Sequence, residues 1–141
     1  MCMWKIKRLF LCLFSVLMLE QVVADVNIGV VPDSRIIIVP GVDIIRQTVT
    51  LFTVEADQPY TIELSDSNNG VMVNAYHSIA YRVSYNNNAE IRMTANPKIV
   101  ESGSVVSSVS REIAVTILGV DTATAAAGDY SATLTITITG Y

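Results

Sequence analysis

The sequence predicts an all-β fold, an Ig-like β-sandwich. Short stretches in which apolar and polar residues alternate recur along the chain, and turn-forming residues separate them. No window of about twelve residues or more shows the helical period. About seven or eight short strands in about 115 residues is the pattern of an Ig-like sandwich.

The first 24 residues are expected to be a signal peptide rather than part of this fold. A basic region opens the chain, and residues 9–19 form an apolar run that is too short to span a bilayer, which needs about 20 residues. Residues 22–24 then offer small side chains at the positions that a signal peptidase recognises, and we expect cleavage after Ala24. A retained membrane anchor is the alternative. The predicted organisation is a signal peptide at 1–24, an N-terminal arm at 25–34 and a domain at 35–141.

Removal of the first segment changes the composition of the chain. Both cysteines, Cys2 and Cys12, lie within it, so the exported chain would have no disulfide. Three of the nine basic residues and one of the thirteen acidic residues also lie within it, so residues 25–141 hold six basic and twelve acidic residues, a net charge of −6. This acidic balance argues against nucleic acid and anionic lipid as partners.

The first half of the remaining chain holds four expected strands. Alternating or dense apolar residues mark them, at 26–31, 35–39, 48–54 and 60–64. The turns between them contain proline, at Pro32-Asp33, Pro40-Gly41 and Asp57-Gln58-Pro59. Residues 66–70 follow, and because Asn69-Gly70 suits positive φ, we expect a hairpin turn there.

The second half continues this pattern. Strands are expected at 71–74, 79–85, 91–94, 113–118 and 130–139. The strand at 79–85 would be ended by three asparagines, and its apolar side would consist of Ile79, Tyr81, Val83 and Tyr85. Residues 102–110 are rich in serine, valine and glycine, and we expect a long connection or an irregular edge there.

The last strand is the strongest feature of the sequence. Every second residue from 130 to 138 is apolar or aromatic, and hydroxyl-bearing residues alternate with them. One face would therefore carry Tyr130, Ala132, Leu134, Ile136 and Ile138. At about ten residues the strand exceeds the usual length, and it has neither charge nor proline to block an edge. We expect this strand to pair with a partner.

Signals for catalysis or for a bound metal are weak. His77 is the only histidine and has no nucleophile-elbow or oxyanion motif beside it, so we expect a surface histidine rather than a catalytic one. Residues 66–70 resemble the start of a calcium loop, but His77 stands where a bidentate glutamate is needed, which favours a turn. Four tyrosines either form a ligand-binding platform or, as we expect for two or three of them, line the core: Tyr60, Tyr76, Tyr81 and Tyr85. No catalytic residue, cofactor or metal site is predicted.

The N-terminal arm carries interaction chemistry of its own. Val26, Ile28 and Val30 alternate in an otherwise polar segment, so their side chains would share one face. Such an arm can pair with its own sheet or be donated to a neighbouring molecule, where backbone hydrogen bonds supply affinity and apolar side chains fill pockets. The arm either ends at Pro32 or continues through Val39.

With these features the chain resembles the subunits of chaperone–usher fimbriae of Gram-negative bacteria, of the cysteine-free type. In that family a glycine typically stands fourteenth from the C-terminus and an aromatic residue stands next to last. Gly128 is fourteenth here, and Tyr141 is the terminal residue. Residues 127–138 also resemble the ending of spore-coat-U-like domains of archaic pili, as 59–65 and 79–85 resemble strands of those domains, although their usual disulfide is missing.

The resemblance implies an incomplete Ig-like sandwich that lacks its last strand. A periplasmic chaperone would lend a strand that pairs with the final strand of the subunit. The N-terminal arm of the next subunit, through Val26, Ile28 and Val30, would then replace the chaperone's strand. The residues of the acceptor edge would be Gly128, Tyr130, Ala132, Leu134, Ile136, Ile138 and Tyr141. The expected partners are the chaperone, an outer-membrane usher, neighbouring subunits and a host receptor, with no nucleic acid.

The expected function is therefore that of a non-enzymatic structural subunit of a surface fimbria. The chain would be exported through the periplasm to the cell surface, polymerise by donor-strand exchange and contribute to adhesion. The alternative is a self-complete secreted Ig-like binding module for a glycan or another surface ligand, in which the arm folds into its own sheet.

Overall fold

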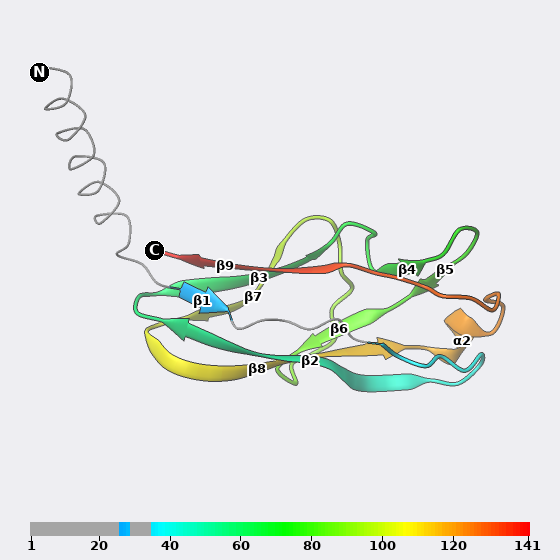
Figure 1. Ribbon diagram of the computed structural model, residues 1–141, viewed down its shortest axis with the longest axis horizontal. Coiled ribbons are helices and arrows are strands. Elements are labelled where there is room, and N and C mark those ends of the chain that lie inside the picture. Colours follow the sequence, from blue (N-terminus) through cyan, green and yellow to red (C-terminus); the bar gives the residue numbers. More distant parts are fainter. Residues whose placement is uncertain (1–25, 29–34) are drawn as a thin grey trace, which may run out of the picture.

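Two antiparallel sheets form the body of the molecule, and each combines strands that are distant in the sequence (Figure 1). The structure is a computed structural model and describes residues 26–28 and 35–141. The first sheet has the order β1-β2-β8-β6. Its strands are β1 (Val26–Ile28), β2 (Ile44–Ala56), β8 (Val106–Ile117) and β6 (Arg82–Tyr85).

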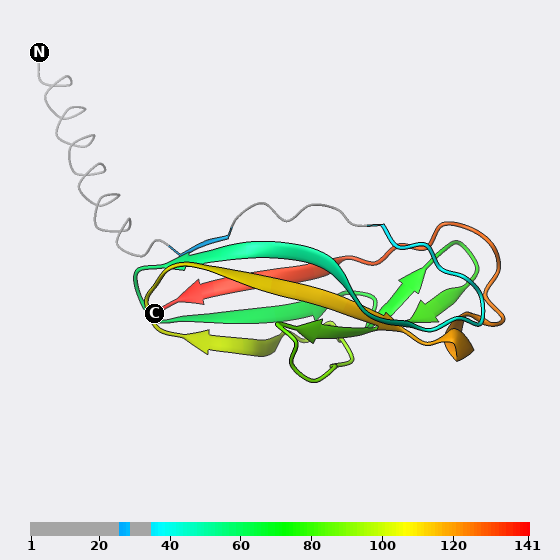
Figure 2. The same cartoon turned by 90° about the horizontal axis from the view of Figure 1, so that it is seen from below.

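The second sheet has the order β7-β3-β9 and lies against the first as a second layer (Figure 2). Its strands are β7 (Lys98–Gly103), β3 (Tyr60–Asp66) and β9 (Leu134–Gly140). At one end of the sandwich, β4 (Val71–Val73) and β5 (Ser78–Ala80) form a separate hairpin near the short helix α2 (Gly119–Thr122). The C-terminus lies at the opposite end, beside β1.

The strand order is that of an Ig-like sandwich, which confirms the predicted fold class. Such sandwiches place strands A, B, E and D in one sheet and C, F and G in the other. Across the first sheet, β1, β2, β8 and β6 take the places of A, B, E and D, and in the second sheet β3 and β9 take those of C and F. Within the described residues no strand takes the place of G, which would lie beyond β9. β7 departs from the pattern. In the chain it lies between β6 and β8, which take the places of D and E, yet it pairs with β3 in the second sheet.

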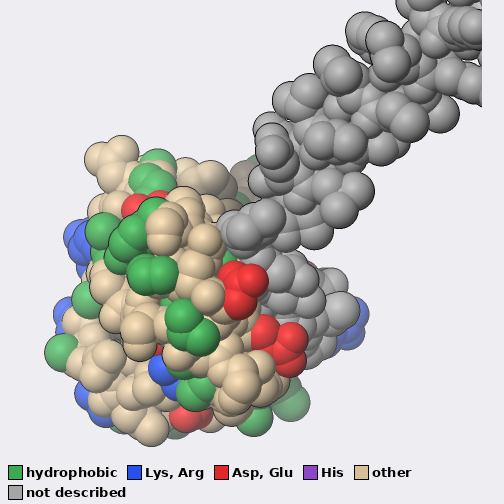
Figure 3. Space-filling model, turned by 90° about the vertical axis from the view of Figure 1, so that its left-hand side faces the viewer, with side chains coloured by type: hydrophobic (Ala, Val, Ile, Leu, Met, Phe, Trp, Pro, Cys, Tyr) green, Lys and Arg blue, Asp and Glu red, His purple; other side chains and the backbone are tan. Residues whose placement is uncertain are grey.

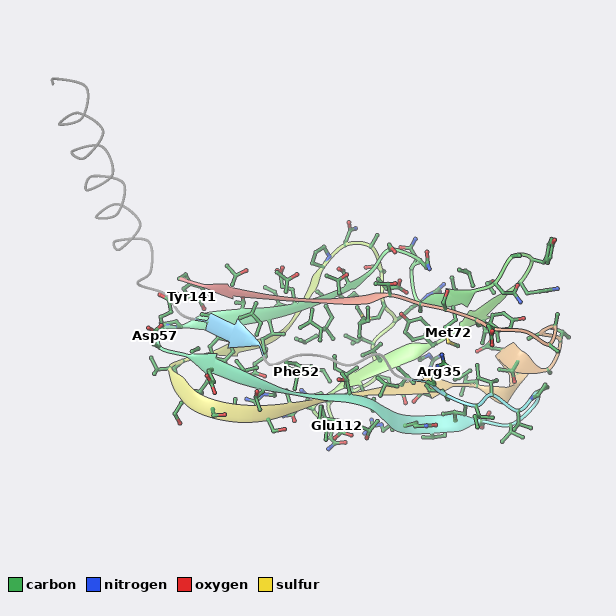
Figure 4. All side chains as sticks on the ribbon, in the orientation of Figure 1. Arg35, Phe52, Asp57, Met72, Glu112 and Tyr141 are labelled. Carbon is green, nitrogen blue, oxygen red and sulfur yellow. The ribbon has the colours of Figure 1, made fainter. Side chains whose placement is uncertain are left out.

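Alternation along the strands fills the space between the layers with apolar side chains. Tyr60, Ile62 and Leu64 of β3 point inward and are at most 1% exposed. From β2, Phe52 points between the layers, whereas Glu112 of β8 points away from them (Figure 4). The core is completed by Val54, Ala56, Ile79, Tyr81, Val83, Tyr85, Met93, Ile113, Val115 and Ile117. Each large side chain that is fully buried in this way contributes about 1.5–3 kcal/mol.

A polar cluster ties the two sheets together at this core. Glu101 of β7 accepts hydrogen bonds from the hydroxyl of Tyr60 on β3, at 2.7 Å, and from that of Tyr85 on β6, at 2.5 Å. Arg111 of β8 donates to both carboxylate oxygens, from Nε at 2.6 Å and from Nη2 at 2.7 Å. The Arg111 guanidinium and the two hydroxyls hold the pKa of Glu101 at about 2, well below its ordinary value. The cluster thus links strands of both sheets without a covalent bond.

The strand predicted at 79–85 is divided into β5 and β6, with Tyr81 between them. Its predicted inward face is nevertheless confirmed, because all four alternating side chains are buried. The asparagines that follow end β6 as predicted, and Asn86 and Asn87 adopt positive φ. The division arises because the chain passes here from the small hairpin into the first sheet, so the two halves pair with different strands.

One other predicted strand is wrong, because residues 91–94 form no strand and Ile91 makes only an isolated bridge with Val83. Of the two alternatives for residues 102–110, the long connection is wrong, because they contain the end of the edge strand β7 and the first part of β8. The irregular edge is confirmed, because this part of β8 pairs with β2 alone, with a register shift, and β6 pairs only with residues 113–116. The ladder with β2 outweighs the weak strand preference of the serines.

Candidate functional site

β9 lies at an edge of its sheet. It pairs antiparallel with β3, from Asp66 opposite Leu134 to Tyr60 opposite Gly140, and no second strand pairs with it among residues 26–28 and 35–141. The strand begins at Leu134 rather than at Tyr130 as predicted. In the segment before it, Ser131 forms only an isolated bridge with β4. β9 therefore has seven residues rather than about ten.

The two faces of β9 differ as predicted. Its threonines are exposed, whereas Leu134, Ile136 and Ile138 point toward the core and pack against it. These three are only half-buried, although Ile62 and Leu64, which lie on β3 opposite Ile138 and Ile136, are 0% exposed. The core is thus less well covered at β9 than at β3. A further strand beside β9 would bury more of this apolar surface, at about 25 cal/mol per Å².

The N-terminal segment of the same chain lies close to β9. β1 pairs antiparallel with β2, with Val26 opposite Ala56, and Figure 1 shows it between β9 and β2. A Cβ placed at Gly140 of β9 would come within 2.8 Å of Cγ2 of Val26. Two of the three predicted donor residues thus belong to a three-residue strand in their own sheet, and Val30 lies outside the described residues.

The strand predicted at 35–39 is absent, although its side chains alternate as in a strand. Ile36 and Ile38 are half-buried against the core, whereas Ile37 is 88% and Val39 is 53% exposed. Residues 35–39 belong to no sheet, because a strand requires a neighbour to pair with and none of the described strands pairs with them.

These features define a seam between the two sheets, which is lined by half-buried apolar side chains. It consists of Val26, Ile36 and Ile38 on the N-terminal side and Leu134, Ile136 and Ile138 on the side of β9. All six pack against the core cluster. The seam is therefore the place at which an added or exchanged strand would change the burial of the core most.

The turn that follows the N-terminal segment is fixed by hydrogen bonds to α2. The N–H of Gly41 donates to Oγ1 of Thr122 at 3.0 Å, and Asp43 Oδ1 accepts from the N–H of Gly119 at 2.6 Å. Gly41 has φ +77°, a conformation that glycine adopts without a steric penalty. A Cβ at Gly119 would lie 2.5 Å from the Gly41 oxygen, so the backbones touch here. We call residues 40–43 the locked turn.

The other residues predicted for the acceptor edge lie outside the seam. Ala132 is exposed, and its predicted place on the apolar face is wrong because strand geometry begins only two residues later. Tyr130 is half-buried, and its hydroxyl donates to the carbonyl of Ala126 at 2.9 Å. Gly128 is exposed in the loop before β9, and Tyr141 is exposed at the far end, where its N–H donates to a carbonyl of the β2–β3 loop at 3.0 Å.

The turn at 66–70 is confirmed, but it is not a hairpin turn, because it joins β3 to β4 in a different sheet. The carboxylate of Asp66 is buried and accepts from the N–H groups of Asn68 and Gly70 and from the Tyr81 hydroxyl, at 2.8 Å each. Groups of the protein itself therefore satisfy both oxygens, which favours the turn over a calcium loop. Burial, together with this hydrogen bond, raises the pKa of Tyr81 above its ordinary value.

His77 is exposed in the turn between β4 and β5, where its backbone N–H donates to Oδ1 of Asn74 at 2.7 Å. Tyr76, beside it, is exposed as well. The other three tyrosines are buried in the core as expected, so the four share no binding surface: Tyr60, Tyr81 and Tyr85. In the described part of the chain, no group of three or more His, Cys, Asp or Glu residues could hold a metal ion.

The end of the molecule that carries the C-terminus presents a mixed surface. Hydrophobic, acidic and basic side chains lie interspersed among the described residues there (Figure 3). Within the residues that the structure describes, no helix is long and apolar enough to cross a bilayer. The signal peptide expected at 1–24 lies outside those residues.

Three comparisons with known proteins complete the description of the site. The chain matches no family model, no curated protein and no solved structure.

Proposed function

We propose that this chain is a structural subunit of a bacterial surface fimbria, exported through the periplasm, polymerised by donor-strand exchange and contributing to adhesion. The observation that carries the proposal is β9, which takes the place of strand F at a sheet edge and whose inward side chains are only half-buried. A strand from a partner would add backbone hydrogen bonds along β9 and would cover Leu134, Ile136 and Ile138.

The donor would be the N-terminal segment of the next subunit. Val26, Ile28 and Val30 have the same period of two as the inward row of β9, so one face of the donor can cover that row. Burial of three such side chains contributes on the order of 5–8 kcal/mol before the entropy of ordering is subtracted. Since β3 and β8 already form a packed core, the ordering cost falls mainly on the donor. A periplasmic chaperone would protect the same edge before an outer-membrane usher assembles the fimbria.

The test is the size of the exported chain, with and without residues 25–31. On denaturing gels, unheated samples of the complete chain should show a ladder of multimers that disappears on heating, and the deletion should remove the ladder. Because the deletion also shortens the chain, a variant of unchanged length is needed to show that the apolar side chains are responsible. Replacing Val26, Ile28 and Val30 together by serine should remove the ladder, whereas Asn27→Ser should leave it. A single monomeric size for every variant would contradict the proposal.

One observation favours a second function, that of a self-complete secreted binding module. β1 pairs with β2 of its own chain and lies beside β9, so the arm covers part of its own core. A module of this kind would stay monomeric at all concentrations. Deletion of residues 25–31 would then lower the midpoint of thermal unfolding without changing the size of the protein.

A further inference from the structure

The direction of the N-terminal segment limits how two copies of this chain could exchange it. β1 runs antiparallel to β2 and lies opposite the last residues of that strand. Residues 35–39 lead to the locked turn, which lies at the end of the sandwich that carries α2 and the β4–β5 hairpin (Figure 1). A segment released from this sheet would therefore remain attached at the α2 end.

We propose that two copies of the chain exchange this segment reciprocally, so that β1 of each copy pairs with β2 of the other in a closed, twofold-symmetric dimer. Exchange of an identical element reuses contacts that the monomer already makes, so no new complementary surface is needed. Both segments are attached at the α2 end, so the two copies must meet through that end and the exchange is complete after two. The inference does not depend on the proposed function, in which the segment pairs with β9 and the number of subunits is not limited.

The contacts of the segment indicate where it separates from the body. Before the locked turn, the described residues are held by a three-residue ladder and by the half-buried side chains of Val26, Ile36 and Ile38. From Asp43 onward the backbone is held by the hydrogen bond between Asp43 and Gly119 and then by the long ladder of β2 with β8. Gly41 lies just before this part and is held by one hydrogen bond, to Thr122, which opening would break. The hinge is therefore placed at residues 39–41.

Exposed apolar side chains gather at the end where the two copies would meet. Val42 is 51% and Val120 is 76% exposed. A Cβ at Gly119 would lie 2.9 Å from the nitrogen of Val42, which places Val42 beside the residue that precedes Val120. Both valines therefore belong to one surface at this end, on the body side of the hinge. Contact between two copies through this end would remove that apolar surface from water.

Disulfide trapping tests the exchange directly. Asn27 stands opposite Glu55 in the register of β1 and β2, and opposite residues of adjacent antiparallel strands are close enough for a disulfide. The full chain would be prepared with both native cysteines replaced by serine, once with Asn27→Cys and once with Glu55→Cys. The two variants would be mixed, unfolded, refolded together and oxidised. We expect a disulfide-linked heterodimer. As a control, Asn27→Cys would be mixed with Arg82→Cys, whose site is exposed on β6 at the opposite edge of the sheet, and this mixture should give no heterodimer.

The hinge and the meeting surface can be tested separately by light scattering over a range of concentrations. A Cβ at Gly41 would contact nothing within 4 Å, so Gly41→Ala strains only the backbone of the turn. Dimer formation would relieve this backbone strain in both copies. We therefore expect the association constant of Gly41→Ala to be at least about tenfold higher than that of wild type. Val120→Glu should lower the dimer fraction, whereas Leu51→Glu, an exposed site on the outer face of β2, should not.

The possible outcomes separate this inference from the fimbrial proposal. A ladder of multimers without the heterodimer would overturn reciprocal exchange and leave donation to β9 in place. A cross-linked dimer without any ladder would support reciprocal exchange and contradict the fimbrial proposal. Monomers under all conditions, with Gly41→Ala included, would overturn reciprocal exchange.

Discussion

Replacement of Glu101 by glutamine should destabilise the fold in a pH-dependent way. The carboxylate is the shared acceptor for Arg111, Tyr60 and Tyr85, and glutamine keeps its shape while it loses the charge and one acceptor atom. Arg111 would then remain with an uncompensated charge, although its side chain is only 17% exposed. Loss of a charge-assisted, bidentate pair in such surroundings costs more than loss of a surface salt bridge.

The magnitude follows from the pKa of Glu101, which is lowered from 4.5 to about 2. A difference of about 2.5 in pKa corresponds to about 3 kcal/mol, and screening by solvent at this partly exposed cluster reduces the figure to about 2 kcal/mol. For a domain of this size, that loss lowers the midpoint of thermal unfolding by about 6–10 °C. Because the folded-state pKa is the lower one, the stabilisation is present above pH 4.5 and is lost as the pH falls toward about 2.

The assay is thermal unfolding of wild type and Glu101→Gln, followed by circular dichroism between pH 7 and pH 2. We expect a clear difference in midpoint at pH 7 that shrinks steadily below about pH 4.5. Glu55→Gln is the matched control, because Glu55 is exposed on β2 and its replacement should leave the midpoint nearly unchanged. Equal midpoints for wild type and Glu101→Gln at pH 7, or a difference that does not depend on pH, would refute the reasoning.

Three further predictions concern packing and hydrogen bonds. Gly103→Ala should cost at least about 2 kcal/mol in urea unfolding, because its Cβ would lie 2.4 Å from the Tyr60 ring; a neutral change would show that this ring moves freely. Tyr81→Phe should cost about 1–2 kcal/mol, since it removes the hydroxyl that donates to the buried carboxylate of the 66–70 turn, and unchanged stability would argue against that bond. Ile62→Ala should cost about 3–4 kcal/mol in the monomer and Ile138→Ala about 1–2 kcal/mol, because the first side chain is fully buried and the second only half-buried; equal costs would contradict the incomplete cover at β9.

The sequence by itself determined which side chains face the core in most of the strands. The inward rows of β3 and β9 follow the predicted alternation, and so do the four buried residues of the segment 79–85. The turn at 66–70 and the end of β6 were predictable as well, because asparagine and glycine accept positive φ. Both kinds of feature depend on the local backbone and on neighbouring residues, which a sequence contains in full.

Strand pairing was decided only by the tertiary structure. Residues 35–39 have the apolar alternation of a strand but no described neighbour to pair with, whereas the serine-rich start of β8 becomes a strand because β2 lies beside it. Strand preference depends strongly on such surroundings. For the same reason, the alternation at 130–138 could not show that strand pairing begins only at Leu134, where β3 is in register.

The polar cluster and the seam also required the tertiary structure. Glu101 meets Tyr60, which is 41 residues away in sequence, and Arg111, which is 10 residues away, and no periodicity of either sheet predicts that meeting. Likewise, the row on β9 was visible in the sequence, but its place at a sheet edge beside β1 was not. Side-chain direction is a local property of a strand, whereas its partners and the covering of its edges depend on how distant segments pack together.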